Sequence, residues 1–129
     1  MKYYIDKKLA TDYVTAIEKV KAALKEEGFG VLTEIKIHKT LKEKLDVDFR
    51  EYTILGACNP PLAYKALTAE DKIGTMLPCN VILQKTEDGG VEVAAVDPYA
   101  SMQAIDNDEL KEIAKTVRSK LKRVISRLS

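Results

Sequence analysis

The end of the chain carries the pattern that most restricts the fold. From about Asp106 to Leu128, apolar residues recur at helical spacing and project within an arc of about 120° at 3.6 residues per turn. Acidic residues crowd the beginning of this segment and basic residues crowd its end, as the helix dipole favours. A long helix with one apolar stripe has to bury that stripe against a second layer. The residues of the stripe are Leu110, Ile113, Ala114, Val117, Leu121, Val124, Ile125 and Leu128.

The rest of the chain predicts a second helix and several strands. Tyr13, Ile17, Val20 and Leu24 repeat at the helical spacing, and Gly28 can take the left-handed conformation that ends a helix. Alternating or continuous apolar runs predict strands over 2–5, 30–37, 51–58, 79–86 and 91–96, and the last two form a hairpin. Shorter helices are predicted over 40–45, from a capping box of Thr40 and Glu43, and over 59–67.

This order of elements predicts an α+β fold, a two-layer sandwich. About five mainly antiparallel strands form one layer, and two long helices cover one face of the sheet. A length of 129 residues without a linker or repeat predicts a single domain over 1–129. The strand over 51–58 is apolar on both faces, and the two strands of the hairpin repeat that pattern. We therefore expect the outer face of the sheet to be covered as well, by a second copy of the chain in a homodimer.

Composition and charge argue against several classes of partner. The 21 basic and 20 acidic residues nearly cancel, and the basic residues of the last helix spread over its whole polar side, so no nucleic-acid partner is expected. The longest uncharged stretches fall far short of the roughly 20 apolar residues that span a membrane, so no membrane association is expected. The first residues lack the apolar core of a signal peptide, which predicts a cytoplasmic location with reduced cysteines.

Three short motifs and the closing helix resemble a known family. The motifs are Gly28-Phe-Gly-Val-Leu-Thr-Glu-Ile35, Ala57-Cys-Asn-Pro60 and Leu77-Pro-Cys-Asn-Val81. In this order, over nearly the whole chain, they resemble the bacterial and archaeal family catalogued as domain of unknown function 302. The resemblance implies a fold similar to one half of the TATA-binding protein, a curved antiparallel sheet backed by helices. It implies no activity, and a fold alone transfers none.

The two cysteines are the main candidates for chemistry. Cys58 ends a strand directly before Asn59, which caps the next helix, and a helix N-terminus can lower the pKa of a thiol. Cys79 begins another strand, so the two thiols are expected at the same rim of the sheet, as a redox pair or as two ligands of a soft metal ion. Met76 and Met102 could add thioether ligands. The alternative is that each cysteine is a small buried hydrophobe.

Two further polar residues have a functional and a structural interpretation. Glu34 lies within the first motif and is a candidate ligand-binding residue, or else a solvated strand carboxylate. His38 is expected as a surface histidine at a strand end. Because it is the only histidine and no Cys-x-x-Cys is present, a zinc site is disfavoured.

These residues lead to three hypotheses about function. The first is a small cytosolic homodimeric binding protein, with Cys58 and Cys79 lining a pocket for a metal, a thiol or a small ligand. The second is a thiol-dependent enzyme with Cys58 as nucleophile. The third is a structural interaction module whose apolar sheet face is its binding surface. No catalytic set and no certain cofactor is predicted.

Overall fold

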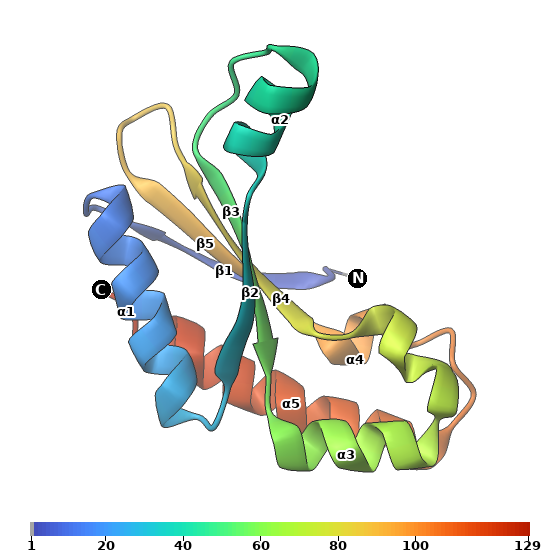
Figure 1. The fold of residues 1–129 in the computed structure, drawn as a ribbon. Coiled ribbons are helices and arrows are strands. Elements are labelled where there is room, and N and C mark those ends of the chain that lie inside the picture. The colour runs from blue at the N-terminus through green and yellow to red at the C-terminus, as the bar shows by residue number, and fades with distance from the viewer. Residues whose placement is uncertain (1) are drawn as a thin grey trace.

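The computed structural model describes residues 2–129 as a single sheet with helices packed against it (Figure 1). The elements in chain order are β1 (Tyr4–Leu9), α1 (Tyr13–Glu26), β2 (Gly30–Lys36), α2 (Ile37–Leu45), β3 (Tyr52–Cys58), α3 (Pro60–Ala69), the 3₁₀ helix η1 (Asp71–Met76), β4 (Cys79–Lys85), β5 (Val91–Val96), α4 (Pro98–Ser101) and α5 (Asp108–Ser126). Within this range no helix combines the length and the apolar character that crossing a membrane requires.

The sheet has five strands in the order β1-β5-β4-β3-β2, and every neighbouring pair is antiparallel. The central strand is therefore β4, and the two edges are β1 and β2. This arrangement confirms the predicted α+β sandwich with a five-stranded antiparallel sheet.

Helices α1 and α5 pack on one face of the sheet, which we call the inner face (Figure 1). Their apolar stripes bury residues such as Val20 and Leu121 against Leu55, Leu83 and Val93 of the strands, all of them essentially inaccessible to solvent. Burial of a side chain of this size stabilises the fold by about 1.5–3 kcal/mol. The two long helices are those predicted from the repeats of apolar residues.

The segment from β2 to α2 differs from the sequence prediction in two ways. First, β2 contains a β-bulge, because Val31 pairs with Ala57 while Thr33 pairs with Gly56, which leaves Leu32 as the extra residue. Val31 and Thr33 therefore lie on opposite faces, where simple alternation places them on one. Second, the strand passes directly into α2 at Ile37, so His38 lies on a helix.

The predicted capping box at Thr40 is wrong. Helix α2 begins three residues earlier, and the hydroxyl of Thr40 donates to the carbonyl oxygen of Lys36 at 3.4 Å instead of capping a helix start. His38 lies in this first turn, and its Nδ1 accepts a hydrogen bond from the backbone N–H of Tyr52 at 3.0 Å. This bond ties the first turn of α2 to the beginning of β3.

The first strand also extends further than predicted, from Tyr4 to Leu9. Two lysines near its end, Lys7 and Lys8, weaken the apolar signal that defines a strand in the sequence. Both pair within the ladder to β5, opposite Val93 and Glu92. An edge strand tolerates such charges because one side of it faces water.

Candidate ligand pocket

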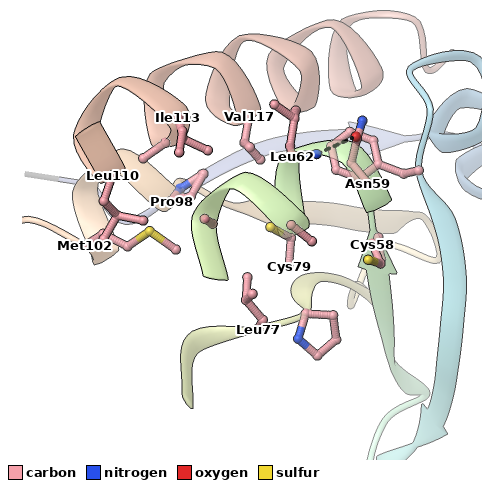
Figure 2. Close-up of a pocket in the computed structure, with 16 residues that line it drawn as sticks. Cys58, Asn59, Leu62, Leu77, Cys79, Pro98, Met102, Leu110, Ile113 and Val117 are labelled. Carbon is pink, nitrogen blue, oxygen red and sulfur yellow. Dashed lines mark hydrogen bonds between the residues drawn. The ribbon is translucent and has the colours of Figure 1, made fainter. Parts of the chain in front are cut away.

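A pocket lies where α3 and α5 meet the ends of β3 and β4 (Figure 2). It encloses about 50 Å³. The pocket lies at the junction of two hydrophobic clusters, the main core between sheet and helices and a smaller cluster around Ile73 and Leu110. Its lining consists of Phe29, Ala57, Cys58, Asn59, Leu62, Ala63, Ala66, Leu77, Pro78, Cys79, Pro98, Met102, Leu110, Ile113, Ala114 and Val117, and none of these side chains is charged.

Asn59 joins three elements at the edge of this pocket. Its Oδ1 accepts a hydrogen bond from the backbone N–H of Leu62 at 3.4 Å, which caps α3, as the sequence predicts. Its Nδ2 donates to the carbonyl oxygen of Glu27 at 3.2 Å, at the end of α1. The chain leaves α1 through Gly28, whose φ of +86° is one that L side chains rarely adopt. Both polar atoms of the buried Asn59 amide are thus bonded within the protein and help to hold the fold.

Helix α3 forms one wall of the pocket and is held mainly at its ends. One of its side chains, Ala66, is fully buried, whereas Tyr64 and Leu67 are exposed. Asn59 fixes its first turn, and the Nδ2 of Asn107 donates to the carbonyl oxygen of Ala69 at 2.9 Å at its last turn. A helix with so little buried apolar surface can open locally at a smaller cost in free energy than the core helices.

Cys58 and Cys79 lie at the same rim of the sheet, at the ends of two neighbouring antiparallel strands (Figure 2). Cys79 pairs with Ala57, so Cys58 is one position further along its strand. Because successive side chains of a strand point to opposite faces, the two thiols leave their strands on different sides, yet both cysteines border the same pocket at the strand ends. Cys79 is buried on the inner face and Cys58 is half-buried, and both are free thiols.

The environment of Cys79 suppresses its ionisation. Burial, and after it the neighbouring Cys58, raises the pKa of the Cys79 thiol to about 11. The charged thiolate is disfavoured in an apolar setting because it loses its hydration. At neutral pH Cys79 is therefore a protonated, weakly nucleophilic side chain.

Few side chains near this rim could bind a soft metal ion together with the cysteines. In residues 2–129, no three side chains of His, Cys, Asp or Glu come together as a group that could hold a metal ion. Met102 lines the pocket with the two cysteines, but Met76 does not and is exposed. A metal held by Cys58 and Cys79 stays a prediction.

Glu34 does not join the cysteines. It lies on β2 opposite Leu55, and its carboxylate forms an ion pair with the Nζ of Lys21 at 2.8 Å. That pair links the edge strand to α1 on the inner face, away from the residues that line the pocket. This contact favours the structural interpretation of Glu34.

Most residues of the pocket lining could not be predicted from the sequence, because they are small or apolar and carry no reactive group. The space exists because small side chains, Ala57, Ala63, Ala66 and Ala114, stand where strands and helices approach each other. A sequence signal for them is present, since alanine recurs along α3 and one alanine, Ala114, stands within the apolar stripe of α5. The signal is weak because alanine also favours any helix.

Comparison with known proteins places the chain in a family. The family model described as domain of unknown function DUF302 matches residues 5–128. The chain belongs to this family. A solved structure of similar fold is the crystal structure of an uncharacterised conserved DUF302 protein from Bacillus stearothermophilus, with a TM-score of 0.93. It shares 28% sequence identity with this chain, and the match covers 100% of both chains. No curated protein matches the chain significantly.

Proposed function

We propose that this DUF302 protein is a binding module for a small, neutral, apolar molecule held in the pocket beneath α3. The observation that carries this proposal is the lining itself, which has no charged side chain and one amide, that of Asn59, already bonded within the protein. A charged ligand would lose its hydration there without gaining a partner, at a cost of several kcal/mol. Such a lining selects by shape and apolar contact.

The size of the pocket indicates that α3 has to move when a ligand binds. A volume of about 50 Å³ is well below the roughly 150 Å³ of an engineered apolar cavity that takes benzene. Helix α3 is the wall best suited to yield, since Ala66 is its one fully buried side chain. A ring or a short aliphatic chain would displace α3 outward and rest against Ala114 and Met102.

Titration of the ¹⁵N-labelled protein with toluene tests this proposal. We expect saturable shifts of the amide signals in α3 and the facing part of α5. In the variant Ala66→Leu the new side chain fills the space, so the affinity for toluene should fall at least tenfold. The matched control is Ala69→Leu, which adds the same side chain to the same helix outside the lining and should bind toluene as the parent does.

The spectra also show whether each variant is folded. If Ala66→Leu does not fold, Ala63→Val fills a half-buried part of the same lining and takes its place. Shifts that do not saturate, or equal affinities of the parent and a folded pocket-filling variant, would overturn the proposal.

A further inference from the structure

The face of the sheet opposite α1 and α5, which we call the outer face, is apolar across several strands. Ile35, Ile54, Ile82 and Ala94 stand directly beside one another on β2, β3, β4 and β5. Ile54, Ile82 and Ala94 are half-buried and Ile35 is 45% exposed. A contiguous apolar row of this kind on a soluble domain marks an interaction surface.

The two halves of the outer face differ in shape. Over β4, β5 and β1 the surface is hollowed, with a volume of about 400 Å³, and Ala94, Val96 and Ile82 lie in the hollow. On the other half, β3 and β2 present the larger side chains of Ile54 and Ile35. The hollow extends from β4 towards β1, with Tyr52 of β3 at its border, whereas Ile54 and Ile35 lie on the other side of the central strand β4.

The charges on the outer face also differ between the two sides of β4. The Nε of Arg50, next to β3, donates to the Oε1 of Gln84 at 2.8 Å, and the Nε2 of Gln84 donates to the Oε1 of Glu92 at 2.9 Å. This polar row begins with a cation on the β3 side, crosses β4 at Gln84, and ends with a carboxylate on β5. Lys2 and Lys8 lie near the acidic end, where Lys8 pairs with Glu92 in the ladder and Lys2 forms an ion pair with Asp6.

We propose that the outer face binds a second copy of this chain, with a two-fold axis that runs along β4. Such an axis places β3 of one copy over β5 of the other, so Ile54 enters the hollow at the partner's Ala94. The same axis passes near Gln84 and brings Arg50 of each copy over Glu92 of the other. A two-fold interface has to be self-complementary. The shape of the face between β3 and β5 and its polar row meet that condition, whereas Ile35 at the edge comes over the partner's Asp6 and adds nothing to the affinity.

The dimensions of the face predict a weak dimer. Five strands about 4.8 Å apart and about 20 Å long cover a flat area on the order of 500 Å², without the extra surface of protruding side chains. Stable interfaces bury about 800 Å² on each partner, so this one lies at the small end. We expect dissociation in the micromolar range. This inference does not rest on the proposed pocket, because the outer face and the pocket share neither Ile54 nor Glu92.

Sedimentation velocity between 10 and 100 µM tests the inference through charge reversal. Arg50→Glu and Glu92→Arg each place two like-charge contacts in the homodimer, so each variant alone should weaken the dimer at least tenfold. In a 1:1 mixture, the Arg50→Glu copy meets the Glu92→Arg copy with opposite charges at both contacts. The mixture should therefore regain the dimer that neither variant forms alone.

Ile82→Glu, which places a charge near the axis, should be monomeric at 100 µM. The control is Val14→Glu, an exposed position on α1, which should dimerise like the parent. A parent chain that is monomeric at 100 µM, or a mixture no more dimeric than its components, would overturn the inference. A dimer unaffected by Ile82→Glu would do the same, because it would have to form through another face.

Discussion

The two thiols meet at one rim of the sheet but belong to different faces of it. Cys79 is packed into the core and its pKa is raised to about 11, whereas Cys58 is half-buried at the end of β3. The sequence predicts that they lie close together, because Cys58 ends one strand and Cys79 begins its neighbour. It does not show the register of the strands, in which Cys79 pairs with Ala57 and not with Cys58.

We therefore predict that Cys58 reacts with iodoacetamide at least ten times faster than Cys79 at pH 8. The thiolate is the reactive form, and a thiol with a pKa of about 11 is ionised to roughly one part in a thousand at that pH. Peptide mapping of the native protein over time gives both rates. In urea the two rates should become similar. Native labelling of Cys79 as fast as Cys58 would contradict the burial of Cys79. Slow labelling of both would remove Cys58 as a candidate nucleophile.

Gly56 illustrates a close approach between neighbouring strands. A Cβ at this position would lie 2.3 Å from the Oγ1 of Thr33 and 2.8 Å from the Cγ of Pro78. Gly56→Ala should therefore lower the free energy of unfolding, by about 1–3 kcal/mol, as overpacking does elsewhere. Urea denaturation followed by circular dichroism measures the change.

Two further variants separate this contact from a general effect of removing glycine. Gly30→Ala lies on the neighbouring strand with nothing within 4 Å of the new Cβ, and it should change stability far less. Combining Gly56→Ala with Thr33→Ala should recover part of the loss. If Gly30→Ala and Gly56→Ala destabilise the protein equally, the contact with Thr33 and Pro78 is not the cause.

At the scale of elements, the C-terminal ends of α1 and α5 are joined by a buried carboxylate. The side chain of Glu27 is 7% exposed and contacts Arg123 of α5 at 3.1 Å and Arg127, which directly follows that helix, at 2.8 Å. Burial by itself raises the pKa of Glu27, but the hydrogen bond from Arg123 and the charges of both arginines outweigh it and hold that pKa below its ordinary 4.5.

Glu27→Gln should lower the melting temperature at pH 7, and the difference from the parent should shrink as the pH falls below 4.5. A carboxyl whose pKa is lower in the folded state stabilises the fold above its unfolded pKa. That contribution is lost as the pH falls through the folded value. Scanning calorimetry from pH 7 to pH 3 measures it. Glu26→Gln is the control, since this exposed neighbour has one ion pair, to Arg127. A difference independent of pH would assign the effect of Glu27 to packing.

Elements with a strong local pattern could be predicted from the sequence, and those set by tertiary contacts could not. The stripe of α5 and the asparagine cap of α3 are local, so their positions follow from spacing and residue type. The bulge at Leu32 and the first turn of α2 both contact the partner strand β3, through the pairing of Thr33 with Gly56 and the bond from Tyr52 to His38. Nothing in the residues of β2 alone encodes that register.

At the scale of the whole molecule, the order of helices and strands was sufficient to predict the fold but not to predict the pocket. Antiparallel strands and two amphipathic helices leave few two-layer arrangements, and the observed five-stranded antiparallel sheet with helices is one of them. The pocket arises where α3 crosses α5, and its walls come from residues as far apart as Phe29 and Val117. Such a space depends on distances between elements, which spacing along the chain does not contain.

The position of β1 has a consequence for the order in which the protein can be made. Tyr4 pairs with Val96 and Leu9 with Val91, so β1 can pair with its neighbour only after β5 has been synthesised. The hairpin of β4 and β5 and its neighbour β3 form ladders between segments closer in sequence, and contacts of this kind form fastest. During synthesis β1 therefore stays unpaired until β5 has been made, and its docking beside β5 is among the last steps that complete the sheet.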